Sequence, residues 1–175
     1  MLLGYAKRLK NTLSVRRAEK ERYAAVRQFV KERGRGRLLD IGMGSDEMLR
    51  MLGGKGLDLY GVDISSADRE RSIDEIALMG MASIEELPYN DGFFDCVTSV
   101  DTPPLWQDKA AAFAEILRVL RSGGQLVCAF EFDDETGAGT PPRAFRAQAR
   151  KAGLVNVSVK VLREDGGYLL VGEKP

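Results

Sequence analysis

From residue 36 onward, short apolar runs alternate with stretches in which apolar residues recur at helical spacing. Short apolar runs such as "RLLDI" and "LDLYGVD" have the length and branched content of buried strands. Between them, apolar residues recur at helical spacing, as in "DKAAAFAEILRVLRSGG". Strands are therefore predicted at 37–41, 57–63, 80–84, 93–100 and 125–132, followed by a hairpin of 154–162 and 168–174. Helices are predicted at 46–52, 66–79 and 108–124, and after Thr140, with Pro141 as the first helical residue.

The first 36 residues show only the helical period. We expect two helices there, 2–10 and 15–32, with Ser14 as the N-cap of the second and "RGRGR" ending it. Because strands and helices alternate afterwards, the expected fold is α/β: a Rossmann-like, seven-stranded, mostly parallel sheet with helices on both faces and a C-terminal antiparallel hairpin. Residues 1–175 are predicted to form one domain, with N-terminal basic helices (1–36) and a Rossmann-like core (37–175).

The composition is that of a globular protein with one core. The chain has 175 residues, of which 44% are hydrophobic and 30% charged, and it contains no histidine. A Ser-His-Asp triad is thereby excluded, and two cysteines without histidine do not form a typical structural zinc site. Cys96 and Cys128 lie in apolar strand-like runs and are expected to be buried free thiols, with no metal bound. No apolar run is long enough to span a bilayer and no leader is evident, so the expected location is cytoplasmic.

Charge is unevenly distributed although the net charge is zero. Residues 1–37 carry 12 basic and 3 acidic side chains, and the remainder carries 14 basic and 23 acidic ones. The basic segment is expected to dock on the acidic body or to be a solvated helix face. An RNA partner stays open as an alternative, which would show an affinity that falls steeply with salt.

The turn after the first strand, "DIGMGSD", carries the strongest chemical signal. Gly42 and Gly44 allow a sharp turn and a close approach of backbone to a ligand. A dinucleotide fingerprint would need glycine where Glu47 stands, and the acids Asp46 and Glu47 would oppose a pyrophosphate. A cationic nucleoside without phosphate, S-adenosylmethionine, fits better. Asp63 ends the second strand, where an acid can accept hydrogen bonds from ribose hydroxyls.

Four stretches in order resemble the class I S-adenosylmethionine-dependent methyltransferases, and in particular the small type 11, UbiE-like group. They are "LLDIGMGSD", "LYGVDIS", "ASIEELPYNDGFFDCVTSV" and "EILRVLRSGGQLV", and together they cover residues 37–132. The resemblance implies a transferase that uses S-adenosylmethionine as its cofactor.

The resemblance assigns ten residues to the cofactor: Asp40, Gly42, Gly44, Asp46, Asp63, Ile64, Ser83, Ile84, Ser99 and Val100. Asp40 would organise the loop around the methionine part, and Asp63 would hold the ribose. Ile64 would pack on the adenine, Ile84 would offer it a backbone N–H, and the last two residues would line the methionyl side. The chain departs from the family at Asp46, where a third glycine is usual, and at Ser83, where an acid usually receives the adenine amino group. Both departures predict a weaker cofactor site, or an inactive one.

Methyl transfer from a sulfonium is an in-line displacement that needs an aligned acceptor and exclusion of water. Three residues are substrate-side candidates: Asp101, Trp106 and Glu131. Trp106 is alternatively a packing residue under its loop, and no catalytic residue is assigned. "TPPL" differs from the (Asn/Asp)-Pro-Pro-aromatic motif of amino-group methyltransferases at Thr102 and Leu105, which argues against that specificity.

The expected function is methyl transfer to a small-molecule acceptor that the sequence does not identify. Two alternatives stay open: a catalytically weak or inactive partner protein of the same fold, and an RNA-modifying methyltransferase that uses the basic N-terminus. The chain is expected to be a monomer or a homodimer. Tyr5 and Tyr23 of the N-terminal helices are the two candidates to close the site, and nothing in their spacing selects one.

Overall fold

A computed structural model describes residues 2–32, 35–42, 47–53, 56–64, 77–132, 141–162 and 167–175, and for 2–16, 47 and 77–79 the backbone alone. The helices are α1 (Leu2–Lys31), α2 (Glu47–Leu52), α3 (Lys109–Val119) and α4 (Pro142–Ala152), with a 3-10 turn η2 (Pro103–Leu105). The strands are β1 (Gly36–Ile41), β2 (Leu57–Asp63), β3 (Ala77–Met81), β4 (Phe94–Val100), β5 (Leu120–Glu131), β6 (Val155–Val161) and β7 (Gly167–Glu173). None of the described helices is both long and apolar enough to cross a membrane.

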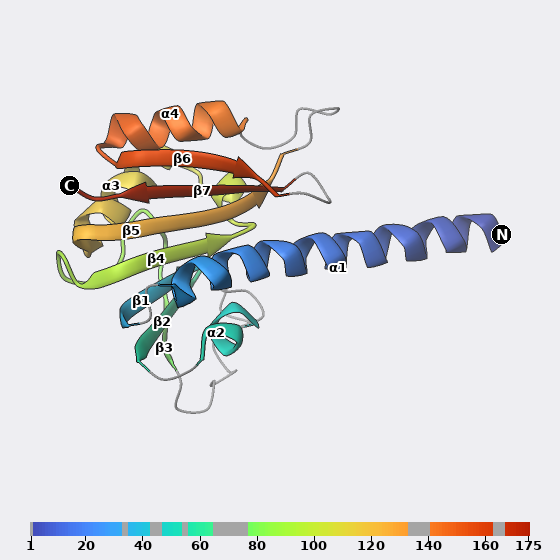
Figure 1. Cartoon of the computed structure of the whole chain (residues 1–175), viewed down its shortest axis with the longest axis horizontal. Helices are drawn as coiled ribbons and strands as arrows, with labels where there is room; N and C mark the ends of the chain where they lie inside the picture. Colours follow the sequence, from blue (N-terminus) through green and yellow to red (C-terminus); the bar gives the residue numbers. More distant parts are fainter. Residues whose placement is uncertain are drawn as a thin grey trace.

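The seven strands form one sheet in the order β3-β2-β1-β4-β5-β7-β6 (Figure 1). β1 pairs in parallel with both β2 and β4, and β5 continues the parallel set, whereas β7 pairs antiparallel with β5 and β6. The predicted fold class is therefore confirmed. Because the chain turns from β1 to β2 on one side and places β4 on the other, the carboxyl ends of β1 and β4 border a crevice where such sheets bind ligands.

Helices cover both faces of the sheet, because β1 carries buried apolar side chains on both of its faces. Leu38 and Leu39 are both fully buried and point to opposite faces, because successive strand side chains alternate. The Leu38 face packs against α1 and α2, and the Leu39 face packs against α3 and α4. The terminal hairpin extends the sheet beyond β5, and the amino-terminal part of α1 projects past the sheet's carboxyl edge (Figure 1).

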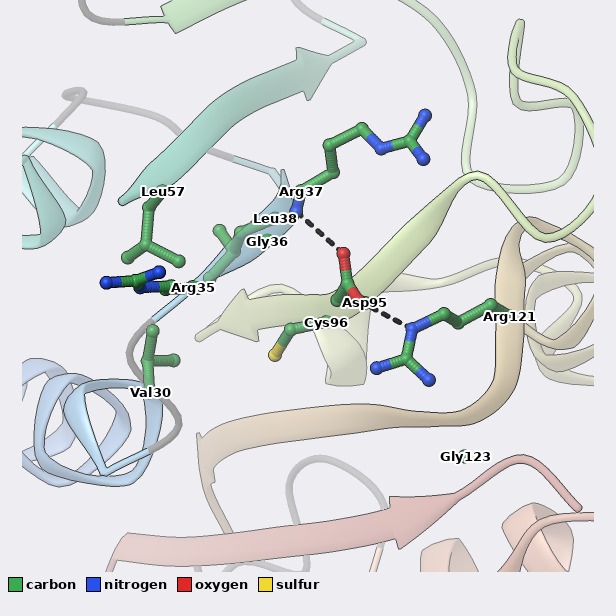
Figure 2. A pocket seen from close by; sticks show the side chains of 10 residues that line it. All are labelled: Val30, Arg35, Gly36, Arg37, Leu38, Leu57, Asp95, Cys96, Arg121 and Gly123. Carbon is green, nitrogen blue, oxygen red and sulfur yellow. Dashed lines mark hydrogen bonds and ion pairs between the residues drawn. The ribbon is translucent and has the colours of Figure 1, made fainter. Parts of the chain in front are cut away.

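Asp95 ties three strands together at the opposite, amino edge of the sheet. Its carboxylate accepts hydrogen bonds from the backbone N–H of Arg37, at 2.8 Å, and from Nε of Arg121, at 2.5 Å (Figure 2). Gly36 has a φ of +120°, and a Cβ there would lie 2.4 Å from an Asp95 oxygen, so glycine is required for this approach.

The N-terminal prediction of two helices is wrong: α1 is one helix of 30 residues. The segment "NTLS" around the expected break contains neither glycine nor proline. Asn, Thr and Ser each cost only a few tenths of a kcal/mol up to about 0.7 kcal/mol in a helix interior, which is too little to force a break.

Three predicted boundaries are also wrong. The helix expected to begin at Pro141 is α4, which begins at Pro142 and has Pro141 as its N-cap. The helix expected at 108–124 ends at Val119, because Leu120 is extended, with ψ of 138°, and fully buried at the start of β5. The strand expected at 80–84 is β3, so Ala77 to Met79, predicted as the end of a helix, pair with β2. Apolar residues at a boundary fit either period, and here pairing with the neighbouring strand decides. Residues 66–76 of that expected helix lie outside the described residues.

Cys96 and Cys128 are buried and are not joined in a disulfide, as predicted. Complete burial raises the pKa of the Cys128 thiol far above its ordinary value, and the nearby Cys96 and Asp40 add to the effect. Cys128 is therefore a packing residue in the core of the sheet.

Candidate functional site

A pocket of about 370 Å³ lies at the carboxyl ends of β1 and β2, between the β3–β4 loop and the β4–α3 loop. It is lined by Ile41, Gly42, Val62, Asp63, Ile64, Ala82, Ser83, Ile84, Glu85, Thr102, Leu105, Trp106 and Gln107. Six of the predicted site residues, Gly42, Asp63, Ile64, Ser83, Ile84 and Trp106, are thus brought together. Two carboxylates and no basic side chain are among the described lining residues.

Gly42 lets the backbone leave β1 at the pocket floor. Its φ is +73°, and its N–H donates to the carbonyl of Val62 at 2.8 Å. A Cβ on residue 42 would lie 2.3 Å from Cγ2 of Thr102 and 2.8 Å from its Cβ. Thr102 is itself held by a 3.2 Å bond from its hydroxyl to the carbonyl of Ile41. Both the backbone conformation and the closeness of the β4–α3 loop therefore require glycine at position 42.

Apolar side chains stand exposed at two sides of the pocket. Ile64, directly after Asp63 at the end of β2, is 72% exposed, and Leu105 in η2 is 75% exposed. Large aliphatic side chains usually bury most of their surface, so two that line one cavity mark a place for a flat apolar group. Leu105 was not predicted as a site residue. Its signal in the sequence was an apolar residue where a related motif has an aromatic one.

The β3–β4 loop supplies a third wall. Ser83 donates its hydroxyl proton to the carboxylate of Glu85. This hydrogen bond lowers the pKa of Glu85, so its carboxylate stays ionised beside the pocket. Glu85 was not predicted as a site residue either. It places an acid two residues from the position where the family usually has one.

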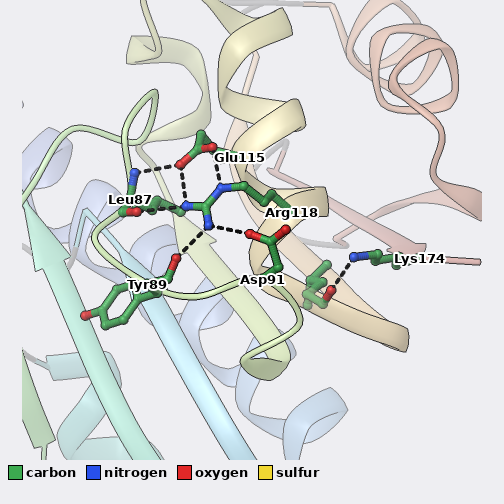
Figure 3. Close-up of polar contacts among 7 residues, drawn as sticks. Leu87, Tyr89, Asp91, Glu115, Arg118 and Lys174 are labelled. Carbon is green, nitrogen blue, oxygen red and sulfur yellow. Dashed lines mark hydrogen bonds and ion pairs between the residues drawn. The ribbon is translucent and has the colours of Figure 1, made fainter.

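Arg118 of α3 fixes the following part of that loop (Figure 3). Its guanidinium makes five hydrogen bonds: two to Glu115, two to the carbonyls of Leu87 and Tyr89, and one to Asp91. Glu115 in turn accepts the N–H of Leu87 at 2.8 Å. All five N–H groups of the arginine are used, which no other side chain can reproduce.

Replacing Arg118 with lysine is expected to lower the free energy of unfolding by about 2–4 kcal/mol, because an ammonium has three N–H donors and leaves two of the five hydrogen bonds unmade. Urea denaturation measures the loss. The control is Arg17→Lys, which changes an exposed pair to Glu21 at 3.7 Å and is expected to change stability by less than about 0.5 kcal/mol. Equal, small losses of stability in the two variants would contradict the role given to Arg118 in fixing the loop.

Asp40 is buried and is not among the residues that line the pocket. Its side chain is 2% exposed and accepts a hydrogen bond from Thr98 Oγ1 at 2.7 Å. Burial raises the pKa of Asp40 to about 7, a bond from Thr98 partly offsets this, and the charge of Asp63 adds to it. Ser99 is also fully buried, donating to the carbonyl of Ile41 at 2.9 Å, and Val100 packs on the α1 face. None of these three predicted residues lines the pocket.

The raised pKa of Asp40 predicts a pH-dependent stability. The unfolded carboxyl ionises near its ordinary 3.8 and the folded one near 7, so the unfolded state binds fewer protons between these values. Stability therefore falls as pH rises from about 4 to about 7, by at most about 4 kcal/mol, and is unaffected by this group outside that window.

The variant Asp40→Asn removes this titration, so its stability relative to wild type should increase between about pH 4.5 and about pH 7.5. Urea unfolding at both pH values measures the difference. Asp58→Asn, at an exposed position on β2, is the control and should show no such change. The expectation fails if Asp40→Asn and wild type keep a constant difference across the range.

The substrate-side candidates Asp101 and Glu131 are joined by a residue that the sequence did not single out. Arg22 of α1, with its side chain 5% exposed, lies 2.6 Å from Asp101 and 2.5 Å from Glu131. The 2.6 Å contact joins Nε of Arg22 to Asp101 as an ion pair. Nη2 of Arg22 also donates a hydrogen bond to Asp101 at 2.9 Å. Burial lowers the pKa of Arg22, but the two carboxylates outweigh it and the net shift is upward. Burial raises the pKa of Asp101, and Arg22 offsets only part of that rise.

This ion-pair cluster fastens α1 to the carboxyl ends of β4 and β5. Asp101 adopts a φ of +60°, an uncommon conformation for a residue other than glycine, and its side chain remains 36% exposed. Glu131 is 50% exposed on its side chain. Two partly exposed carboxylates therefore share one buried guanidinium, and Asp101 directly precedes the pocket residue Thr102.

Trp106 lines the pocket and also packs beneath its loop. Its ring lies 5.6 Å from those of Phe113 and Phe145, and the residue is 6% exposed. The expected packing role is confirmed by these contacts. Gly44 and Asp46, and the side chain of Tyr5, lie outside the described part of the chain.

The chain is similar to known methyltransferases. The family described as "methyltransferase domain" matches residues 39–128, about half of the chain. An uncharacterized methyltransferase of Mycobacterium tuberculosis is 36% identical over 103 residues, which are 57% of this chain and 41% of the relative. A sarcosine/dimethylglycine N-methyltransferase of Halorhodospira halochloris is 29% identical over 140 residues, 74% of this chain and 50% of the relative. The chain thus spans half or less of the length of these two relatives.

The fold is shared with a solved structure of a Thermotoga maritima protein described as an S-adenosylmethionine-dependent methyltransferase and possible histamine N-methyltransferase. The TM-score is 0.71 at 19% identity, and the match covers 90% of this chain and 91% of the other. At that identity the likeness concerns the fold. Together with the family match over the glycine turn, Asp63 and the β4–β5 region, it leads to one assignment: the chain belongs to the type 11 methyltransferase-domain family of the class I S-adenosylmethionine-dependent methyltransferases.

Proposed function

We propose that the pocket at the carboxyl ends of β1 and β2 binds S-adenosylmethionine and that the protein transfers its methyl group to a small-molecule acceptor. The chemistry of the residues that line the pocket supports this proposal. Asp63 and Glu85 are acidic, and no described lining residue is basic. Two exposed aliphatic side chains line the same pocket. Phosphate-bearing nucleotides are disfavoured by such a wall, and a cationic nucleoside is favoured. The residues present therefore fit the cofactor.

Each part of the cofactor has a counterpart among these residues. Asp63 accepts hydrogen bonds from the ribose hydroxyls, and Ile64 and Leu105 hold the adenine by apolar contact. The backbone N–H of Ile84 donates to the adenine ring. The adenine amino group donates to Glu85 or to Ser83, so the missing acid at position 83 is compensated from position 85.

When bound, the cofactor supplies an electrophilic methyl group on a sulfonium. The protein's own contribution is to fix the acceptor and to exclude water, and a base is needed only for an acceptor that keeps its proton. Asp101 is the proposed orienting group for the acceptor, and Arg22 holds it in place at the edge of the pocket. Glu131 shares that arginine and adds negative charge on the same side.

Turnover tests this function. Incubation with S-adenosylmethionine and a set of small amines and phenols, including sarcosine and dimethylglycine, should give acceptor-dependent S-adenosylhomocysteine. The same reaction with Asp63→Ala should give none above the blank without acceptor. Firm cofactor binding without turnover on any acceptor would instead favour the non-catalytic partner protein.

A further inference from the structure

A second cavity, of about 240 Å³, opens at the amino edge of the sheet, opposite the cofactor pocket (Figure 2). Val30 of α1 and the first residues of β1, β2 and β4 line it, together with Arg121 and Gly123 of β5. It shares no described lining residue with the cofactor pocket. The proposed methyl transfer therefore leaves this cavity without a role.

The charges around this amino-edge pocket are mostly positive. Three arginines, Arg35, Arg37 and Arg121, line it with one acid, Asp95. Burial alone would raise the pKa of Asp95, but hydrogen bonds from Arg121 and from the Arg37 backbone outweigh it, and the pKa lies below its ordinary value. Asp95 is thus a permanent anion that neutralises only one of the three guanidinium groups.

Two of the guanidinium groups keep N–H donors that no described residue accepts. Arg121 donates Nε to Asp95 and Nη1 to the carbonyl of Ser122, and its Nη2 makes no hydrogen bond to a described residue. Arg35 is exposed, lies on the other side of the pocket next to Val30, and has no ion-pair partner among the described residues (Figure 2). Arg37 instead holds its guanidinium 4.2 Å above the Phe93 ring.

The space between these two arginines is apolar. Val30, Leu38, Leu57 and Cys96 line it, and the Cys96 side chain lies between Arg35 and Arg121 in the view of Figure 2. An inorganic ion would leave this surface without contacts. A ligand with a short apolar part would cover it and gain free energy in proportion to the area removed from water.

We propose that the amino-edge pocket binds a small organic anion, with a carboxylate or phosphate group paired with the arginines of the pocket and a short apolar part against Val30, Leu38 and Leu57. Guanidinium groups match both headgroups in geometry and charge. Asp95 pre-orients one of the two arginines, so part of the ordering cost is met before the ligand arrives.

Calorimetric titration of the full chain with phenyl phosphate, and separately with benzoate, tests the site. Saturable 1:1 binding with a dissociation constant of about 1 mM or below is expected for at least one probe. Arg35→Gln should weaken it about tenfold, because one charge-assisted hydrogen bond is lost. Arg143→Gln, which removes an exposed arginine of α4, is the matched control and should leave the affinity unchanged. The tighter of the two probes identifies the headgroup.

Cys96 provides an independent readout, since it is 8% exposed in this pocket and Cys128 is fully buried. Saturating probe should slow the alkylation of Cys96 by iodoacetamide in the wild type. The proposal is overturned if neither probe saturates by about 10 mM. An equal loss of probe affinity in Arg35→Gln and in the control Arg143→Gln would overturn it as well. So would displacement of the probe by S-adenosylhomocysteine.

Discussion

Replacing Asp63 with alanine is expected to weaken the binding of S-adenosylmethionine by at least about a hundredfold. Two charge-assisted hydrogen bonds to the ribose are lost, each worth about 1.5–3 kcal/mol, and 1.4 kcal/mol corresponds to a factor of ten. Asp63 lies at the end of β2 and lines the pocket, so the loss falls on the site itself. Calorimetric titration with S-adenosylhomocysteine measures it without turnover.

Two companion variants make the Asp63 result specific. Asp63→Asn keeps the shape and one acceptor oxygen, and is expected to retain part of the affinity. Asp58→Ala removes an exposed acid from the start of the same strand, and is expected to bind as the wild type does. An unchanged affinity of Asp63→Ala, or an equal loss in Asp58→Ala, would show that Asp63 does not hold the ribose.

Replacing Gly42 with alanine is expected to cost about 2–5 kcal/mol of stability and to abolish cofactor binding. The left-handed backbone costs about 1–2 kcal/mol for a residue with a Cβ, and the overpacking against Thr102 adds about 1–3 kcal/mol. Relief of a 2.3 Å contact requires Thr102 to move, and Thr102 is part of the pocket wall. Thermal unfolding and cofactor titration measure the two losses.

Gly80 offers a matched control for Gly42 on a neighbouring part of the sheet. A Cβ there meets nothing within 4 Å, and the position is an exposed one in β3. Gly80→Ala is expected to be neutral or to stabilise by up to about 1 kcal/mol, because the unfolded chain loses freedom. Similar behaviour of the two alanine variants would contradict the role given to Gly42.

Much of the fold could be predicted because each strand carries its own apolar signal. β2 occupies the predicted 57–63, and the order of strands and helices after residue 36 led to the correct sheet class. The single helix α1 could not be predicted from capping residues alone, since Ser14 is compatible with a helix interior as well as with an N-cap. The start of β5 at Leu120 depends on pairing with Phe94, which the local sequence does not encode.

The same distinction applies to the site. Gly42, Asp63 and Ile64 could be predicted because they end or directly follow predicted strands, where parallel sheets bind ligands. Leu105 and Glu85 could not, because they reach the pocket only through the folding of two loops. Nor does any local pattern relate Arg22 to acids 79 and 109 residues away.

The cofactor role assigned to Asp40, Ser99 and Val100 stays a prediction, since these residues are buried and none of them lines the pocket. The pKa of Asp40, near 7, nevertheless predicts an effect of pH on cofactor affinity. A cation bound above Asp40 favours its ionised form, so cofactor affinity should rise with pH through about 7.

The central claim is that a carboxylate-lined pocket selects a cationic nucleoside over a phosphorylated one. The most direct test is calorimetric titration of the protein with S-adenosylmethionine and with ATP under the same conditions. The account predicts 1:1 binding of S-adenosylmethionine and no detectable heat from ATP. No binding of S-adenosylmethionine at millimolar concentration, or ATP binding of equal strength, would contradict it.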